Sequence, residues 1–377
     1  MKITFLIRSL DAGGAERQLV DLAVPLHARG HEVAVVPFYE GGSLAGELQA
    51  NGVRVTALGK RGRWDVVRPF ARLVRQLRKE RPDILHPYMT TANIVASIVA
   101  PLLARTKIVW GVRASNLDLS RYDRVSRLLD GIERRLSRQP SLVIANSNAG
   151  RDHAVRGGFP ADKCVVVPNG IDAARFQYDP EGRHRLRSEW NVSADDFVIG
   201  LVGRVDPSKG HDVFLTTAAR LTSCPRNLRF ICVGRRVGDY AQSMEALGRR
   251  LGLADRLIWT GERKDMVSVY SALDILCSAS PSEGFSNVVG EAMACGTLCV
   301  VTDVGDAARI VGPLGVVALG TQSEHLYAAL QTALLDLPRD EEKARKRRQR
   351  IIDLFSPERL VALTEKLLEN ATSGDAR

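Results

Sequence analysis

The stretch LDILCSASPSEGFSNVVGEAMACGTLCVVTDVG, residues 273–305, contains two short apolar runs separated by a polar loop and a helical pattern. LDILCSA and TLCVVT have the composition of buried strands. Between them, Ser286 or Asn287 can cap a helix that stops at Gly296. A strand, a helix and a second strand in this order predict a parallel crossover, the unit of an open α/β sheet.

The same alternation continues in both directions from this stretch. The strand candidates of the first half are ITFLIR, EVAVVPF, RVTAL, DILHPY, KIVWGV, LVIANS and CVVVPN, and those of the second are FVIGLVG, LRFICVG, LIWTG, LDILCSA, TLCVVT and GVVAL. A polar region from Gln177 to Asp196 separates the two series, and a final helix is expected after Ser356. The sequence therefore predicts an α/β protein of two doubly wound domains joined near residues 170–195.

The composition is that of a globular enzyme in a reducing compartment. Of 377 residues, 45% are hydrophobic and 25% charged. The longest apolar stretch, Ile94–Ala104, contains Pro101 and is shorter than the ~20 residues of a membrane span. The start MKITFLIRSLDAGG is interpreted as a strand rather than a signal peptide. The six cysteines form no C-x-x-C pair, so we expect reduced core residues in a cytoplasmic protein.

Positive charge is concentrated in the first half of the chain. Up to Trp190 there are 30 Lys+Arg against 19 Asp+Glu, a net charge of +11, whereas the remainder has 23 against 24, a net charge of −1. This favours an acidic partner for the first half: an anionic membrane, a phosphate-bearing acceptor or nucleic acid. Nucleic acid is disfavoured because only 6% of the residues are aromatic and none are interleaved with the basic ones.

Ligands of open α/β sheets bind at the carboxyl ends of strands, so the loops that follow strands are the candidate sites. Gly13-Gly14 follows the first strand and lets the backbone approach a ligand, although an ordinary tight turn is the alternative. GRVDPSKG is not a P-loop, because its Lys209 precedes the glycine. Arg204 and Lys209 in this loop can clamp a diphosphate; the alternative is a surface turn with two exposed cations.

The loop and helix start of residues 282–296 place two carboxylates around free backbone amides. Glu283 lies in the loop and Glu291 lies one turn into the helix, whose first amides belong to Asn287 and Val288. Carboxylates are poor partners for phosphate, so they are expected to accept hydrogen bonds from hydroxyl groups. A ligand with both phosphates and many hydroxyls is a sugar nucleotide. A helix with a chance glutamate is the alternative, and it does not explain why loop carboxylate, glycine and helix start coincide.

Together these motifs resemble the family 4 glycosyltransferases, which have the GT-B fold. The resemblance covers nearly the whole chain and rests on GGAER, His86 after the fourth strand, VPNGID, GRVDPSKG, and the E-x7-E element from Glu283 to Glu291 followed by VVTDVG. It implies two Rossmann-like domains facing a central cleft: an acceptor domain of residues 1–175 and a nucleotide-sugar domain of residues 176–355. The C-terminal helix, about 356–372, would pack back on the first domain.

The resemblance also implies roles for single residues. Arg204 and Lys209 would bind the donor pyrophosphate, Glu291 the ribose and Glu283 the donor sugar, while His86 would face the reacting sugar. The other residues expected to line the donor site are Gly13, Gly14, Gly284, Phe285, Ser286, Asn287, Val288 and Arg263. Arg263 would touch the base or simply be exposed.

The implied reaction is transfer of a hexose or N-acetylhexosamine from a UDP- or GDP-linked donor with retention of anomeric configuration. The departing phosphate would take the acceptor proton, and the chain contains no Asp-x-Asp, so neither a metal nor another cofactor is expected. Two segments depart from the family pattern, residues 305–309 and 233–240. Both would flank the nucleotide pocket, so the identity of the base stays open.

The acceptor is expected to be a glycan or a lipid-linked sugar, such as a polyprenyl-diphosphate-linked one of surface polysaccharide synthesis. Arg113 or Asn116, after the fifth strand, would meet it. The segment of residues 64–83 has a basic face with Arg68, Arg72, Arg75 and Lys79, and a second basic run covers residues 121–138. Such helices suit peripheral contact with an anionic membrane, but an ordinary domain helix is the alternative.

A third charged segment, residues 339–350, is expected to be a solvated helix. Two rival functions also remain open from the sequence: a sugar-nucleotide epimerase on the same fold, and a non-catalytic protein that binds sugar nucleotides. The epimerase would need acid–base residues, for which His86 is the candidate.

Overall fold

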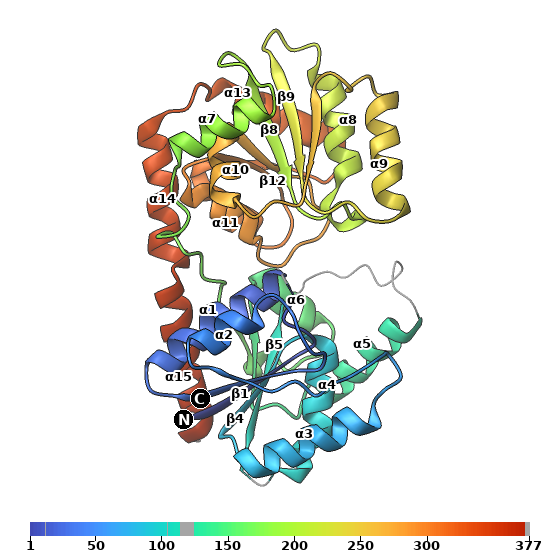
Figure 1. Cartoon of the computed structure of the whole chain (residues 1–377), viewed down its shortest axis with the longest axis vertical. Helices are drawn as coiled ribbons and strands as arrows, with labels where there is room; N and C mark the ends of the chain where they lie inside the picture. Colours follow the sequence, from blue (N-terminus) through green and yellow to red (C-terminus); the bar gives the residue numbers. More distant parts are fainter. Residues whose placement is uncertain (12, 104, 114–123, 374–377) are drawn as a thin grey trace. The chain divides into compact units, whose positions relative to one another are not determined.

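The computed structural model describes residues 1–11, 13–103, 105–113 and 124–373, and the chain forms two compact units. The first unit consists of Met1–Gly170 and Pro357–Arg377, and the second of Ile171–Ser356. Each unit is a parallel sheet with helices on both faces (Figure 1). The predicted α/β fold with two Rossmann-like units is therefore confirmed.

The sheet of the first unit has the strand order β3-β2-β1-β4-β5-β6-β7. The strands are β1 (Lys2–Ile7), β2 (Glu32–Pro37), β3 (Arg54–Val55), β4 (Ile84–Pro87), β5 (Lys107–Val112), β6 (Leu142–Ala145) and β7 (Cys164–Val166). Their pairings are parallel, as the helical patterns between the strand candidates predict.

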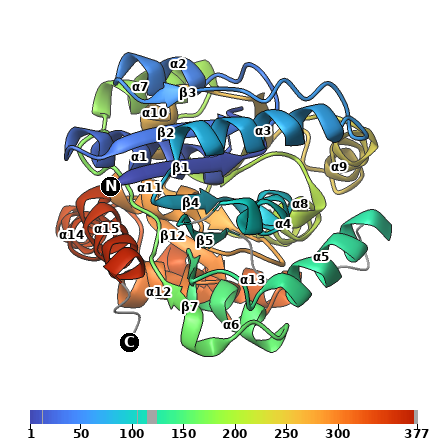
Figure 2. The same cartoon turned by 90° about the horizontal axis from the view of Figure 1, so that it is seen from below.

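Helices cover both faces of this sheet. They are α1 (Gly14–Ala28), α2 (Ala45–Ala50), α3 (Val67–Glu80), α4 (Met89–Val99), α5 (Arg124–Leu136), α6 (Asn148–Arg156) and α15 (Pro357–Ser373), with short 3-10 turns η1 (Ala100–Leu102) and η3 (Ala161–Lys163). One apolar cluster joins the sheet to α1, α2 and α15, and another joins it to α3, α4 and α6. The C-terminal helix thus packs on the first unit, beside α1, as Figure 2 shows.

The second unit repeats the arrangement with the order β10-β9-β8-β11-β12-β13. Its strands are β8 (Phe197–Val202), β9 (Leu228–Val233), β10 (Leu257–Gly261), β11 (Ile275–Ser278), β12 (Leu298–Thr302) and β13 (Val316–Ala318). Its helices are α7 (Pro180–Glu189), α8 (His211–Leu221), α9 (Asp239–Arg250), α10 (Met266–Ala272), α11 (Asn287–Ala294), α12 (Ala307–Val311), α13 (Ser323–Leu335) and α14 (Glu341–Phe355), with 3-10 turns η4 (Pro207–Lys209) and η5 (Gly312–Leu314).

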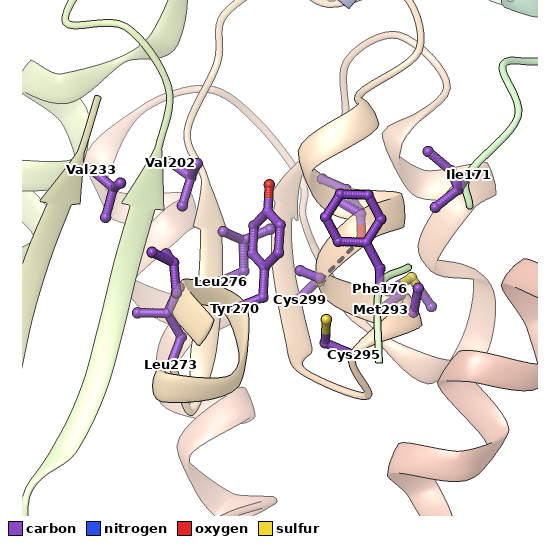
Figure 3. Packing of buried hydrophobic residues seen from close by; sticks show 14 of the residues in the cluster. Ile171, Phe176, Val202, Val233, Tyr270, Leu273, Leu276, Met293, Cys295 and Cys299 are labelled. Atoms are coloured by element: carbon purple, nitrogen blue, oxygen red, sulfur yellow. Dashed lines mark hydrogen bonds between the residues drawn. The ribbon is translucent and has the colours of Figure 1, made fainter. Parts of the chain in front are cut away.

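Two apolar clusters hold the layers of the second unit together. One face of the sheet is covered by α8, α9 and α13, and the other by α7, α10, α11, α12 and α14. Figure 3 shows part of the cluster on the face that α7, α10, α11, α12 and α14 cover. In it lie Leu276 of β11, Met293 of α11 and Leu273, which directly follows α10. All six cysteines are free and five of them are buried.

The expectation of a solvated helix at residues 339–350 holds for one face, on which Glu341, Glu342, Lys343, Arg345 and Lys346 are exposed, and it misses three arginines that turn onto the second unit. Its arginines reach backbone carbonyls of the second unit: Arg348 donates to Ala173 O at 2.7 Å, Phe176 O at 2.6 Å and Ala294 O at 2.9 Å. Arg347 is buried and donates to Leu314 O at 2.9 Å. These arginines attach the inner face of α14 to the second unit, while its outer face remains in water.

Among the residues that the structure describes, no helix combines the length and apolar character that crossing a bilayer requires.

In both sheets the order of connection reverses once, between β1 and β4 and between β8 and β11. At such a switch point the loops after the two strands run apart over opposite faces and leave a crevice at the carboxyl edge. These two edges carry most of the residues that the sequence singled out.

Candidate active site

The loops after β8 and β11 meet at the switch point of the second unit. Gly210, at the N-terminus of α8, has φ 67°, and a Cβ atom there would collide with the carbonyl group of Ala279. Only glycine combines this left-handed conformation with so close an approach. The contact brings the predicted cationic loop of residues 203–210 against the predicted carboxylate loop of residues 279–286.

Lys209 and Glu283 form an ion pair across these two loops. Ser280 Oγ donates to the same carboxylate oxygen, Oε1, at 3.1 Å. The side chains are 28% and 14% exposed, so the pair is desolvated on one side and open to a ligand on the other. The structure thus brings together the two residues that were expected to bind the donor pyrophosphate and sugar.

Arg204 lies at the start of the cationic loop and remains 60% exposed, with Asp206 Oδ2 3.7 Å away. Asp206 fixes the following turn, because its Oδ1 accepts hydrogen bonds from the Ser208 amide at 3.0 Å and from the Ser208 hydroxyl at 2.7 Å. The sequence analysis did not single out Asp206, although an aspartate before Pro-Ser is a recognisable cap. Of the two cations of this loop, Arg204 is thus mostly exposed beside Asp206, whereas Lys209 is shielded and pairs with Glu283.

The N-terminus of α11 differs from the prediction in one respect. Ser286 occupies the cap position, but its hydroxyl makes no capping bond; its Oγ is buried and has no hydrogen-bond partner among the described residues. The α11 amides of Asn287 and Val288 therefore donate no hydrogen bond to the hydroxyl of this expected cap. A buried hydroxyl without a partner at a helix start is suited to hydrogen-bond a ligand.

Gly305 ends the VVTDVG element, just before the residues that depart from the family pattern, and its contacts require a glycine. A Cβ atom there would collide with the carbonyl groups of Glu283 and Gly284, and the Asp306 amide donates to Gly284 O at 3.0 Å. Below this contact the Phe285 ring is buried and packs on Phe355 with ring centroids 5.4 Å apart. Both contacts fix the backbone that presents Glu283.

Glu291 accepts a hydrogen bond from a residue that the sequence analysis missed. Tyr270 Oη donates to Glu291 Oε2 at 2.5 Å, and in Figure 3 this hydroxyl points the same way as the end of β8 at Val202. Burial, and then the neighbouring Glu291, raise the pKa of Tyr270 well above its ordinary value, so it stays a neutral donor. Tyr270 belongs to α10, and no local motif connects it with Glu291.

His211 is a second residue without a signal in the sequence beyond its place after Gly210. Its ring is buried, and neither ring nitrogen has a partner among the described residues. It lies parallel to Trp259, with ring centroids 6.1 Å apart. Burial lowers the pKa of His211 to about 4, so the imidazole beside Lys209 is neutral at physiological pH.

Arg263 is held by carboxylates at the end of β10. Its guanidinium contacts Glu189 at 2.6 Å and Asp265 at 2.8 Å, which raises the pKa of Arg263 and lowers that of Asp265. The side chain is largely shielded, so the alternative of a simply exposed arginine is wrong. Its contact with the base stays a prediction.

The first unit has a polar pocket of about 260 Å³ at the carboxyl edge of its sheet. Arg8, Tyr88, Met89, Asn93, Arg113 and Glu133 are among the residues that line it. Met89, directly after β4, has φ 73°, an unfavourable conformation for a side chain of this kind. Asn93 Nδ2 donates to Glu133 Oε1 at 2.7 Å, and burial raises the pKa of Glu133.

Arg113 lies over this pocket, as its place after the fifth strand predicts. It donates to Tyr88 Oη at 2.6 Å, and its guanidinium carbon lies 4.2 Å from the centre of the Tyr88 ring. Behind Tyr88, the His86 ring is fully buried; its Nδ1 lies 2.6 Å from Val109 O and its Nε2 has no partner among the described residues. Burial and Arg113 lower the pKa of His86 to about 3. Contact between His86 and the reacting sugar stays a prediction, and Asn116 lies outside the described residues.

The Gly13-Gly14 pair lies where β1 passes into α1, with Gly13 as the cap position and Gly14 as the first helical residue. Both are exposed, and the Glu16 carboxylate lies against Gly13. Burial raises the pKa of Glu16. Contact of the two glycines with a donor stays a prediction.

Family models match both units of the chain. Residues 12–175 match the model described as Glycosyltransferase Family 4, and residues 196–336 match the one described as Glycosyl transferases group 1.

Curated relatives and solved structures agree with these matches. D-inositol 3-phosphate glycosyltransferase of Nocardia farcinica is 28% identical over 362 residues, covering 87% of this chain and 78% of that protein. The lipopolysaccharide core biosynthesis mannosyltransferase LpsB of Rhizobium meliloti is 33% identical over 150 residues, covering 39% and 42%. Two other relatives with the same name, from Segniliparus rotundus and Mycobacteroides abscessus, are matched over 39% and 48% of their own length. Among solved structures, Anabaena HepE in complex with UDP-glucose has a TM-score of 0.85 and 26% identity, and covers 98% of this chain and 100% of that one.

Proposed function

We propose, since the chain belongs to glycosyltransferase family 4, that it is a retaining enzyme that moves a hexose or N-acetylhexosamine from a UDP- or GDP-linked donor to a glycan or lipid-linked acceptor. The observation that carries the proposal is the Lys209–Glu283 pair at the switch point of the second unit. A cation for phosphate and a carboxylate for hydroxyls lie there side by side, and a nucleotide sugar needs both. HepE, which is similar over the whole chain, has been solved with UDP-glucose, and this supports UDP as the nucleotide.

The chemistry assigned to this site is stabilisation of a leaving diphosphate. As the bond between the sugar anomeric carbon and the phosphate oxygen breaks, negative charge develops on the diphosphate. Lys209, Arg204 and the first amides of α11 would stabilise that charge, and loss of one such donor typically raises the barrier by about 3–4 kcal/mol. The acceptor oxygen forms the new bond to the anomeric carbon on the same face, and its proton passes to the departing phosphate oxygen. No metal or other cofactor is required in this scheme.

The acceptor is assigned to the polar pocket of the first unit, around Tyr88 and Arg113. LpsB, a similar protein, is named for lipopolysaccharide core biosynthesis, which supports surface polysaccharide synthesis as the setting. The loop before α3 and its first residue expose Trp64, Val66 and Val67 beside basic residues, a composition that suits contact with anionic lipid. We therefore assign the protein to the cytoplasmic face of the membrane, as a peripheral enzyme.

The donor site is tested by calorimetric titration with UDP and GDP in the presence of EDTA. Lys209→Ala is expected to weaken nucleotide binding by about tenfold or more, since a charge-assisted contact to phosphate is lost. Lys343→Ala is the matched control, because Lys343 also pairs with a carboxylate of this unit, Asp336, but lies on α14. Equal nucleotide affinities of the two variants would contradict the assignment of Lys209 to the donor site.

The ribose contact is tested with Tyr270→Phe, which removes the hydroxyl that orients Glu291. The loss of one hydrogen bond of ~1 kcal/mol predicts a roughly fivefold lower nucleotide affinity with unchanged folding. Retention is tested separately, by assigning the anomeric configuration of the product by NMR. A product of inverted configuration contradicts the proposed mechanism but not the donor site.

A further inference from the structure

The first unit contains a second, larger cleft, and of its lining only Trp64 and Val66 were given a role above, as contacts with anionic lipid. It has a volume of about 540 Å³, within the range of small-molecule sites, and it is lined by the loop before α3, by α3 itself and by α4 and α5. Figure 2 shows α4 between α3 and α5. Phe38, Leu58, Leu73, Ile94, Val95 and Leu129 are among its apolar lining residues.

Much of the wall of this cleft is apolar and suits a hydrocarbon chain. Phe38, Leu58 and Leu73 are buried core residues, so they form a fixed apolar floor. Trp64, 82% exposed, and Val66, 56% exposed, line the same cleft, so large apolar groups there face water. Exposed apolar groups that adjoin an apolar cleft usually mark a binding site. A peptide would leave its backbone amides without partners on such walls, whereas a hydrocarbon chain has none to satisfy.

The charged lining of the cleft is mainly cationic. Arg8, Lys60 and Arg63 line it, and Asp65 is the single acidic lining residue in the described part of the chain. Lys60 is fixed in place, because its Nζ donates to Arg63 O at 3.2 Å and to Asp65 O at 2.5 Å. An anionic group next to the hydrocarbon would therefore be favoured.

The cleft adjoins the polar pocket at the carboxyl edge of the sheet. Arg8 and Thr91 line both. One molecule can therefore place a polar head beside Tyr88 and Arg113, an anionic linker at Arg8, and a chain along α3 and α4.

We propose that the apolar cleft between the α3 loop, α4 and α5 binds the aliphatic chain of the acceptor, and that Arg8 meets the phosphate that joins chain and head group. The inference rests on the proposed function, in which the first unit binds the acceptor. It goes beyond it by giving the acceptor an aliphatic chain with a place of its own, separate from any contact with a membrane surface.

The test uses decyl phosphate below its micelle-forming concentration, titrated into the full-length protein, with inorganic phosphate and decanol as comparison ligands. Decyl phosphate is expected to bind more tightly than either, because it alone uses both the cleft and Arg8. Val95→Asn should weaken it by about tenfold, since a polar group then faces the chain. Val155→Asn is the matched control: both valines are half-buried on helices over the same apolar cluster, but only Val95 lines the cleft.

A second variant tests the place of the phosphate. Arg8→Gln should weaken decyl phosphate but leave decanol binding unchanged. The inference is overturned if decyl phosphate does not bind, or if the two asparagine variants weaken it equally. It is also overturned if the protein binds phosphatidylglycerol vesicles but not monomeric decyl phosphate, because the apolar residues then serve a membrane surface. UDP titration of the unaltered protein and of the same variants separates the two proposals. If the unaltered protein does not bind UDP, the proposed donor site is contradicted, but the result with decyl phosphate still decides the present inference.

Discussion

Gly210 is the residue on which the contact between the two donor loops depends. In Gly210→Ala a left-handed φ and a collision with the Ala279 carbonyl coincide, so we expect a loss of about 2–3 kcal/mol of unfolding free energy and weaker nucleotide binding. Urea unfolding and UDP titration measure both. Gly252→Ala is the control, because Gly252 has a similar φ of 71° but no atom within 4 Å of the added Cβ. Equal losses of unfolding free energy in the two variants would show that the two loops move apart to accommodate the added Cβ atom.

His86 and His211 make stability depend on pH. Each has a lower pKa in the folded protein, about 3 and about 4, than the ordinary 6.5, so the unfolded chain binds the proton more tightly. Stability therefore falls as the pH drops below about 6.5, and at pH 5 each histidine should cost roughly 2 kcal/mol relative to pH 7. Urea unfolding at the two pH values measures the difference.

His211→Leu isolates one of these contributions. Neither ring nitrogen of His211 has a partner in the described structure, so an apolar side chain of similar size is tolerated. The variant should lose about half of the predicted difference between pH 7 and pH 5, whereas His325→Leu, at an exposed position, should keep it. If His211→Leu keeps the full difference in unfolding free energy between pH 7 and pH 5, His211 does not contribute to it.

At the scale of elements, α14 depends on its arginines. Arg348→Ala removes three hydrogen bonds to backbone carbonyls and leaves those carbonyls partly buried, so we expect a loss of roughly 2–4 kcal/mol in unfolding free energy. Arg345→Ala, at an exposed position of the same helix, should change it by less than about 0.5 kcal/mol. Chemical denaturation of the two variants is the measurement. Similar unfolding free energies of the two variants would mean that water replaces Arg348 as the hydrogen-bond donor to these carbonyl groups.

The same helix shows where sequence analysis stops. Apolar runs and helical spacing predicted the parallel strands. A strand that is buried on both faces is a continuous run of apolar residues, which can be recognised in the sequence. The pairing of Lys209 with Glu283 followed from their loops, since the fold brings the ends of β8 and β11 together. The partners of Arg348 come from Ala173, Phe176 and Ala294, far apart in sequence, so nothing local distinguishes it from a solvated arginine. Tyr270 beside Glu291 was missed for the same reason.

At the scale of the whole molecule, α15 belongs to the first unit although it follows the second in sequence. Leu368 is fully buried among residues of β1 and α1, so Leu368→Ala should cost about 2–5 kcal/mol. Hydrogen exchange followed by mass spectrometry should show faster exchange in β1 and β2 and unchanged exchange in β8 and β11. Ile351→Ala, equally buried on α14, should show the opposite pattern. Uniform changes in both variants would mean that the two units unfold together.

The return of the last helix has a consequence for synthesis on the ribosome. Residues 171–356 form one unbroken unit, and the whole of it has been translated before α15 exists. Until α15 leaves the exit tunnel, the apolar surface of residues 1–170 that it later covers stays exposed. The first unit is thus completed after the second, although it is translated first, and its uncovered apolar surface is open to wrong contacts during that interval.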